Sequence, residues 1–241
     1  MERWFGNNPL YQALIGGRRY YKCQQGVAWK KTDFLYIGDR VCIDDGVSII
    51  APEKLHIGSD TGIYRGCVVQ AVGGCHIGRG CQIAFGTIIL TTEHVHSGAE
   101  ALPHGLWRYV KPVIIEDFVW IASGVHVSPG VRIGEGAIIG MGSVVMQDVP
   151  PQAIVMGNPA KVMMYRSEEE FHRLKEAGRI IDPFAQSPLL RIPPVTIRKY
   201  GKELKRFGYD VSDGNREFYY DKSAPLSQRI RPFRPEDYTA M

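Results

Sequence analysis

Residues 115–145 read IEDFVWIASGVHVSPGVRIGEGAIIGMGSVV. A β-branched aliphatic residue returns at every sixth position of this stretch, namely at Ile115, Ile121, Val127, Ile133, Ile139 and Val145. Four places after each stands a small or β-branched residue: Val119, Val125, Val131, Ala137, Ser143 and Val149. A helix would repeat every 3.6 residues and an alternating strand every two, so neither explains this spacing. A six-residue period predicts a parallel β-helix, an all-β solenoid in which three units make one triangular coil of about 18 residues.

The same period extends towards the N-terminus in three further sets of three. These sets are Ile37, Ile43 and Ile49; Ile57, Ile63 and Val69; and Ile77, Ile83 and Ile89. Successive sets are 20 residues apart, which places two extra residues per coil at one corner, near Leu55-His56 and Cys75-His76. We therefore predict about five coils within residues 34–165, with Ile154 and Val155 beginning a closing turn.

One interruption breaks the period. From Ile89 to Ile115 the spacing is 26 residues, where an unbroken repeat has six. Residues 91–111 are therefore expected to be ejected from the solenoid as a long loop. Such a loop in a compact repeat is more often functional than decorative. It contains three of the seven histidines, His94, His96 and His104.

The two ends of the chain lack the period. Residues 1–33 are aromatic and basic, and we expect them to cap the open end of the solenoid with a short helix from about Pro9. Residues 166–241 are expected to form a C-terminal helical extension and tail. A helix is predicted from Ser167 to Gly178 by its serine cap, acidic first turn and terminal glycine, and a second from Pro194 to Phe207. The tail is expected to pack along the solenoid or a neighbouring subunit.

The composition is ordinary for a globular protein, with 44% hydrophobic and 22% charged residues. No apolar run reaches about 18 residues and the first residues lack a signal-peptide pattern, so a cytoplasmic location is expected. The net charge of +4 gathers at the two ends of the chain, which fits either a solvated surface or peripheral association with an anionic membrane. The five cysteines include no CxxC pair, so small buried residues are expected rather than metal ligands or disulfides.

Several motifs carry a resemblance to a known family. Residues 115–124 and 127–145, Asp148-Val-Pro-Pro and Gly157-Asn-Pro-Ala-Lys resemble the hexapeptide-repeat acetyltransferases, closest to the galactoside, maltose and polysaccharide O-acetyltransferases. The match is specific over about residues 77–165 and looser over 37–76. It implies a left-handed β-helix, acetyl-CoA as co-substrate, no metal, and a homotrimer with active sites at the subunit interfaces. The implied reaction moves acetyl to a hydroxyl of a saccharide or glycan precursor by direct attack on the thioester.

The resemblance also implies a catalytic histidine. In the family it follows a short threonine-containing run, which here is Leu90-Thr-Thr-Glu-His94, so His94 takes that position. Imidazole has an ordinary pKa of about 6.5 and suits removal of a hydroxyl proton at neutral pH. His96, two residues on, is the alternate base, and either Glu93 or Glu100 could orient the base.

The remaining site residues are inferred from the same resemblance. Candidate acetyl-CoA contacts are Trp120, Ala122, Ser123, Met141, Gln147, Lys161 and Arg166, with Lys161 expected to meet phosphate. Candidate acceptor contacts are Tyr64, Arg65, Glu93 and Trp107, and an arginine there favours an acidic sugar. Two positions depart from the usual pattern. Met141 replaces an alanine and Met146-Gln147 replaces threonine-lysine, so one phosphate contact is expected to be lost or supplied by the basic tail.

Three alternatives stay open at this stage. An N-acetyltransferase of a nucleotide-linked amino sugar would use the same base on an amine. A γ-type carbonic anhydrase relative is suggested by Tyr64-Arg-Gly, but Cys67 replaces the usual aspartate and the zinc histidines are not evident. A structural or binding solenoid without catalysis is the third. The Gly-x-Gly pairs fall at repeat corners and do not indicate a phosphate loop, and no motif indicates nucleic-acid binding.

Overall fold

The computed structural model describes residues 33–184, 189–207, 209–211, 216–220 and 230–232. The chain divides into two compact units, Met1–Phe184 and Ala185–Met241. The expected N-terminal cap, with its helix from Pro9, lies outside the described residues. Within the described ranges, no helix has the length and apolar character needed to cross a bilayer.

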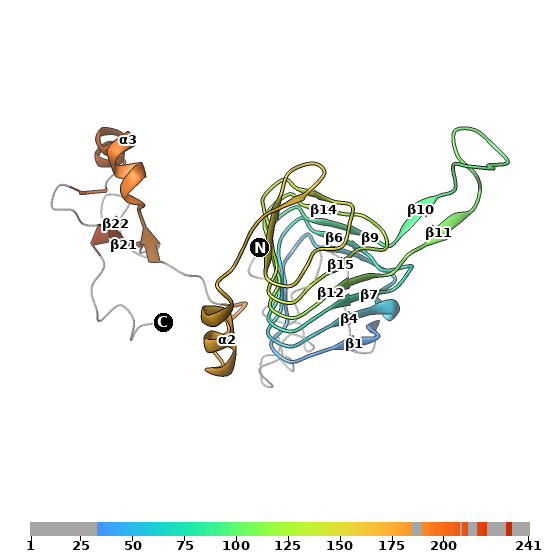
Figure 1. Cartoon of the computed structure of the whole chain (residues 1–241). Helices are drawn as coiled ribbons and strands as arrows, with labels where there is room; N and C mark the ends of the chain where they lie inside the picture. Colours follow the sequence, from blue (N-terminus) through green and yellow to red (C-terminus); the bar gives the residue numbers. More distant parts are fainter. Residues whose placement is uncertain (1–32, 185–188, 208, 212–215, 221–229, 233–241) are drawn as a thin grey trace, which may run out of the picture. The chain divides into compact units, whose positions relative to one another are not determined.

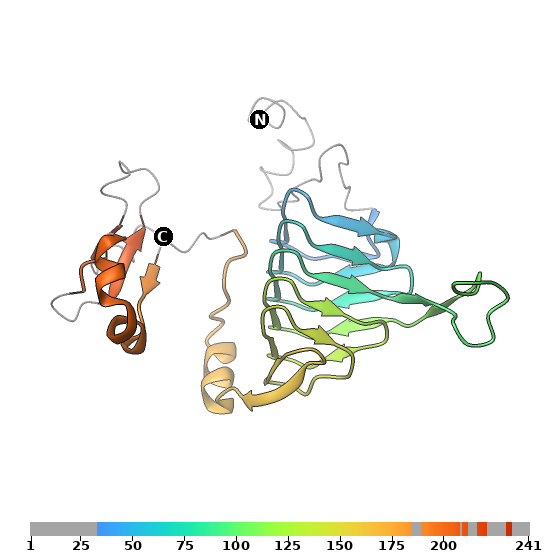
Figure 2. The same ribbon diagram turned by 90° about the horizontal axis from the view of Figure 1, so that it is seen from above.

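The first unit is a solenoid of three parallel sheets, to each of which every coil adds one short strand (Figures 1 and 2). Sheet 1 contains β1 (Tyr36–Ile37), β4 (Leu55–Ile57), β7 (Cys75–Ile77), β12 (Val113–Ile115) and β15 (Arg132–Ile133). Sheet 2 contains β2 (Cys42–Ile43), β5 (Gly62–Ile63), β8 (Gln82–Ile83), β13 (Trp120–Ile121), β16 (Ile138–Ile139) and β18 (Ala153–Met156), with β19 (Lys161–Tyr165) antiparallel at its edge. Sheet 3 contains β3 (Ser48–Ile50), β6 (Val68–Gln70), β9 (Ile88–Leu90), β14 (His126–Val127) and β17 (Val144–Val145).

The residues of the predicted six-residue column form the core. Each is at most 6% exposed, and they pair in register from coil to coil, as Ile37 does with Ile57. The residues four places further on are buried too, Val125 and Ser143 among them. Stacked isoleucine and valine side chains therefore fill the interior, and each coil bonds to its neighbours. The prediction of a left-handed parallel β-helix of about five coils is confirmed, with β18 beginning a sixth.

The extra residues of the early coils lie between sheet 3 and sheet 1, at what we call the insertion corner. Their predicted position near Leu55-His56 and Cys75-His76 is wrong by a few residues, because those residues are already in β4 and β7. The extra residues instead fall at or next to the connecting segments 51–54, which includes the 3₁₀ turn η2 (Pro52–Lys54), and 71–74. Irregular backbone is accommodated here because the corner carries no ladder strand.

The ejected segment is an antiparallel hairpin that leaves the insertion corner between coils three and four. Its strands are β10 (Thr92–His94) and β11 (Arg108–Val110). The Lys111 N–H donates to the Thr91 carbonyl (2.9 Å), so the two feet of the hairpin are joined. Below it the ladder closes, because β7 pairs directly with β12. Figures 1 and 2 show the hairpin projecting away from the coils.

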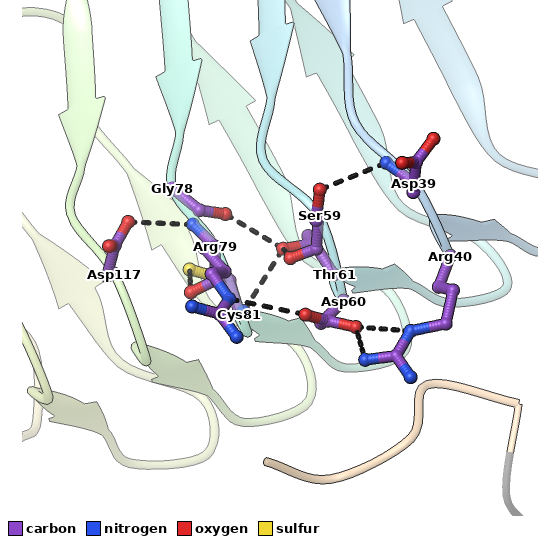
Figure 3. A network of polar contacts seen from close by, with 9 residues as sticks. All are labelled: Asp39, Arg40, Ser59, Asp60, Thr61, Gly78, Arg79, Cys81 and Asp117. Atoms are coloured by element: carbon purple, nitrogen blue, oxygen red, sulfur yellow. Dashed lines mark hydrogen bonds and ion pairs between the residues drawn. The ribbon is translucent and has the colours of Figure 1, made fainter. Parts of the chain in front are cut away.

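The corner between sheet 1 and sheet 2 is held by polar ties between coils (Figure 3). The nearly buried Asp60 carboxylate pairs with Arg40 of the preceding coil and with Arg79 of the next, at 3.3 Å from Arg79 Nε. The Asp39 N–H donates to Ser59 Oγ (3.0 Å) in the same network. These contacts hold neighbouring coils in register on a different corner from the hairpin.

Helix α2 (Glu168–Glu176) belongs to the first unit. Ser167 caps it by accepting from the Glu170 N–H (3.2 Å), as the sequence predicted. Its one buried residue, Phe171, meets Phe118 of the β-helix edge-on, with 6.2 Å between ring centroids. Helix α2 therefore packs on the coils and lies within the compact unit that ends at Phe184.

The second unit combines α3 (Pro194–Arg206) with an antiparallel sheet of β20 (Leu189–Arg191), β21 (Glu217–Tyr220) and β22 (Ile230–Pro232). The predicted second helix is confirmed, and its backbone kinks at Tyr200, next to Gly201. The sheet was not predicted. Its strands have three or four residues and pair across long intervals, so no local period announces them.

Four cysteines lie within the described residues. Cys42, Cys67, Cys75 and Cys81 are buried, as predicted. Burial raises the pKa of the Cys75 and Cys81 thiols to about 12. They are therefore inert core residues at neutral pH.

Candidate active site

The hairpin divides the predicted catalytic residues between its two faces. Because side chains alternate along a strand, Thr92 and His94 share one face and Glu93 lies on the other. His94 pairs with Arg108 across the hairpin, and Glu93 pairs with Tyr109. Glu93 forms an ion pair with Lys111, whose ammonium lies 5.7 Å from the Tyr109 ring centroid. The Glu93 carboxylate is therefore paired with Lys111 on the face of the hairpin opposite His94.

The His94 ring is covered by a second imidazole. The rings of His94 and His104 stack with 3.7 Å between their centroids and 28° between their planes. His104 Nδ1 lies 2.9 Å from the Gly105 carbonyl oxygen, and since a carbonyl only accepts, this nitrogen carries a proton. His94 Nδ1 is buried and has no hydrogen-bond partner among the described residues. The chain itself thus leaves one polar atom of the candidate base unsatisfied.

The other loop candidates point elsewhere. His96 is exposed, with its Nδ1 3.2 Å from Ser97 Oγ. Glu100 accepts from the Leu106 N–H at 3.3 Å, so it braces the loop rather than orienting His94. Trp107 is 71% exposed on the arm that returns towards β11. Each of the two predicted orienting acids is thus engaged with a group other than the His94 ring.

A second group of predicted residues lies at the corner between sheet 2 and sheet 3, which we call the Ser123 corner. Backbone bonds stack its residues coil upon coil, from Gly86 N–H to the Arg65 carbonyl (3.1 Å) and from Gly142 N–H to the Ser123 carbonyl (3.0 Å). The stacked residues at this corner form a column of Arg65, Phe85, Ser123 and Met141, and Ala122 is the residue before Ser123 in the chain. Phe85 is 58% exposed and was missed by the sequence reasoning. An aromatic residue two places after a column isoleucine, where the chain faces solvent, is the signal that could have found it.

Tyr64 is held within the chain. Its hydroxyl contacts Gln82 Oε1 and lies 3.2 Å from the Pro183 carbonyl oxygen. Burial raises the pKa of Tyr64 to about 12, so the phenol keeps its proton at neutral pH and donates it to one of these acceptors. The segment after α2 is thereby fastened to the outer side of sheet 2.

The remaining predicted donor contacts are spread along the β-helix. Trp120 is half-exposed on the outer side of sheet 2, and Lys161 is exposed at the start of β19. Gln147 is exposed after β17, at the insertion corner. Arg166 is already engaged, since its Nη1 donates to the Gly136 carbonyl (3.2 Å) and its guanidinium lies 5.2 Å from the Phe171 ring centroid.

Within one chain, then, most of the predicted residues form two separate groups, and Trp120, Lys161 and Arg166 lie outside both. His94, Glu93, Trp107 and Gln147 belong to the insertion corner, whereas Tyr64, Arg65, Ala122, Ser123 and Met141 belong to the Ser123 corner. Among the described residues, no three His, Cys, Asp or Glu side chains gather in a group able to hold a metal ion.

Comparison with known proteins gives matches over the β-helix. Residues 112–147 match the family described as bacterial transferase hexapeptide (six repeats). A 2,3,4,5-tetrahydropyridine-2,6-dicarboxylate N-acetyltransferase of Staphylococcus carnosus (strain TM300) is 45% identical over 82 residues, which is 33% of this chain and 34% of the relative. This chain therefore covers about a third of the length of that curated relative.

Two solved structures share the architecture. A hexapeptide-repeat acetyltransferase from Vibrio cholerae O1 biovar eltor, complexed with acetyl coenzyme A, is 28% identical with a TM-score of 0.54, covering 57% of this chain and 74% of that one. A maltose O-acetyltransferase from Clostridium difficile 630 is 25% identical with a TM-score of 0.53, covering 69% and 82%. Together with the six-residue column, these likenesses show that the β-helix of this chain carries the bacterial transferase hexapeptide repeat and is similar to the hexapeptide-repeat acetyltransferases.

Proposed function

We propose that this chain transfers acetyl from acetyl-CoA to a hydroxyl of a saccharide or glycan precursor, with His94 as general base. The observation that carries the proposal is the hairpin, which interrupts an otherwise continuous β-helix and presents an imidazole stacked on His104. The solved relatives support the substrate classes, since one is complexed with acetyl coenzyme A and another is a maltose O-acetyltransferase.

The proposed step needs one base and no covalent enzyme intermediate. His94 removes the hydroxyl proton of the acceptor as that oxygen attacks the thioester carbonyl carbon. A carbon–oxygen bond forms and the carbon–sulfur bond breaks. The protonated imidazole then returns its proton to the departing thiolate, so the base is regenerated. Backbone N–H groups are the expected donors to the oxyanion of the tetrahedral intermediate.

The Ser123 corner supports a donor site. Phe85 and Met141 are both exposed there, at 58% and 79%, and an exposed apolar column suits the methylene groups of a pantetheine arm. The Lys161 ammonium is exposed and suits a phosphate. Arg166 is engaged with Phe171, so a phosphate contact from it would have to compete with that packing.

We further propose a homotrimer. In a triangular coil, the insertion corner and the Ser123 corner of one chain point in different directions, so His94 and the donor column do not meet within it. A three-fold arrangement brings the hairpin of one chain to the Ser123 corner of the next.

The exposed cations of α3, which include Arg198, Lys199 and Lys202, are compatible with peripheral association with an anionic membrane.

A second candidate is N-acetylation of an amino sugar or related amine. It is favoured by the 45% identity over 82 residues to an N-acetyltransferase. The same imidazole would remove a proton from the amine nitrogen as that nitrogen attacks the thioester, so His94 keeps its role in either case.

The test is a thiol-release assay with acetyl-CoA against neutral sugars, acidic sugars, lipid-linked glycans and nucleotide-linked amino sugars. We expect release with a hydroxyl acceptor and an acetylated product that mild alkali hydrolyses, because esters are alkali-labile and amides are not. An alkali-stable product would select N-acetylation. Absence of release with every acceptor class would contradict the proposal and favour a non-catalytic solenoid.

A further inference from the structure

The foot of the hairpin is held by a side chain from a neighbouring coil. Gln70 ends β6, in register with Leu90 at the end of β9, where the hairpin begins. Its Oε1 accepts from the Thr91 N–H (3.0 Å), and its Nε2 donates to Thr92 Oγ1 (2.9 Å). Because a backbone N–H can only donate, the Thr91 contact fixes which end of the Gln70 amide carries the oxygen.

The threonines complete this anchor. Thr91 Oγ1 donates to the Gln70 carbonyl (2.7 Å) and accepts from the Gly73 N–H (2.8 Å), so every polar group of its side chain is satisfied. Thr91 is fully buried and Thr92 is 6% exposed. A Cβ on Gly73 would lie 2.3 Å from the Thr91 carbonyl oxygen, so only glycine permits this approach. The threonine-containing run before His94 therefore acts as the root of the hairpin.

The anchor also sets where His94 faces. Thr92 and His94 are two residues apart on β10, and their side chains share one face of the hairpin. The hydrogen bond from Gln70 to the Thr92 hydroxyl restricts the rotation of β10 about its own axis. That rotation determines the direction in which the His94 imidazole leaves the strand.

We propose that Gln70 is a positioning residue for His94, acting through Thr91 and Thr92 without touching substrate. This rests on the proposed function in that the positioned group is the base of acetyl transfer. Misplacing a catalytic group by about 1 Å can cost about 100-fold in rate, so a loosened root should reduce kcat while leaving donor binding at the Ser123 corner intact.

The test compares three variants with the wild-type chain. Gln70→Ala removes every side-chain contact of Gln70 with Thr91 and Thr92. We expect kcat to fall by about 10- to 100-fold, with KM for acetyl-CoA changed less than about twofold. Gln70→Glu keeps an oxygen for the Thr91 N–H and a second one to accept from the Thr92 hydroxyl, so it should stay within about threefold of wild type. Ser59→Ala removes a comparable tie between coils at the corner shown in Figure 3, far from the hairpin, and should leave kcat unchanged.

Two further measurements keep the proposal separate from folding and from the proposed function. Thr92→Val keeps the shape of the side chain but removes the hydroxyl that Gln70 binds. It should show the same kcat loss, and it serves as the test if Gln70→Ala does not fold. Amide hydrogen exchange of β10 and β11 should be faster in Gln70→Ala than in wild type or Ser59→Ala, whatever reaction the protein catalyses. An inactive wild type would contradict the proposed function alone. Unchanged exchange and kcat in Gln70→Ala, or an equal loss in Gln70→Glu, would overturn the positioning role.

Discussion

A column of stacked rings on the outer side of sheet 1 contains a histidine, His76, whose protonation should affect stability. The ring centroids of Tyr36 and His56 lie 4.5 Å apart, and those of His56 and His76 lie 4.2 Å apart. Desolvation lowers the pKa of His76, and the neighbouring His56 adds to that effect. Arg132 acts in the same direction, whereas Asp117 and Glu116 oppose it. The folded protein therefore prefers a neutral His76.

We predict a loss of stability as the pH falls below the ordinary histidine pKa of about 6.5. There the unfolded chain binds a proton that the folded chain takes up less readily, so proton binding favours unfolding. His76→Phe keeps the stack and removes the titration. Urea unfolding near pH 7.5 and near pH 5.5 should show a smaller drop in the free energy of unfolding for His76→Phe than for wild type. His126→Phe, on the exposed side of sheet 3, is the control; a drop unchanged by His76→Phe would contradict the prediction.

At the scale of elements, the sequence predicted the structure correctly where the six-residue repeat is present. Ile115 to Val145 could be placed in the core from sequence because each coil repeats the same burial pattern, and every column residue is buried. The hairpin could be located, because the period stops at Ile89, but its β10–β11 pairing could not be inferred from a stretch without a period. Tyr64 was expected to face an acceptor. The hydrogen bond between the Tyr64 hydroxyl and the Pro183 carbonyl joins residues 119 apart in sequence, so no local sequence pattern could predict it.

The stack of His104 on His94 gives the hairpin a testable internal contact. Aromatic pairs of this kind contribute about 0.5–1.5 kcal/mol, which corresponds to about two- to twelvefold in a rate that depends on the orientation of the ring. His104→Ala should therefore lower kcat by about that factor. His104→Phe keeps a flat ring over His94 and should stay near wild type in steady-state kinetics. A loss as large in His104→Phe as in His104→Ala would show that the imidazole chemistry of His104 matters, rather than its stacking.

At the scale of the whole molecule, the candidate site residues are concentrated in the first unit. All candidate catalytic and binding residues lie between Tyr64 and Arg166, within the compact unit that ends at Phe184. The β-helix supplies a rigid ladder, and the hairpin is the one long insertion in the ladder between β1 and β18. The proposed assembly joins the two corners that a single chain keeps apart.

The most direct measurement is the rate of acetyl-CoA-dependent transfer by His94→Ala and His96→Ala, assayed side by side with wild type. General-base catalysis typically contributes about 100- to 10,000-fold, so His94→Ala should lose activity in that range at unchanged KM for acetyl-CoA. His96→Ala, two residues away and exposed, should retain wild-type activity. Full activity in His94→Ala, or a loss confined to His96→Ala, would contradict the central claim that the hairpin presents His94 as the base.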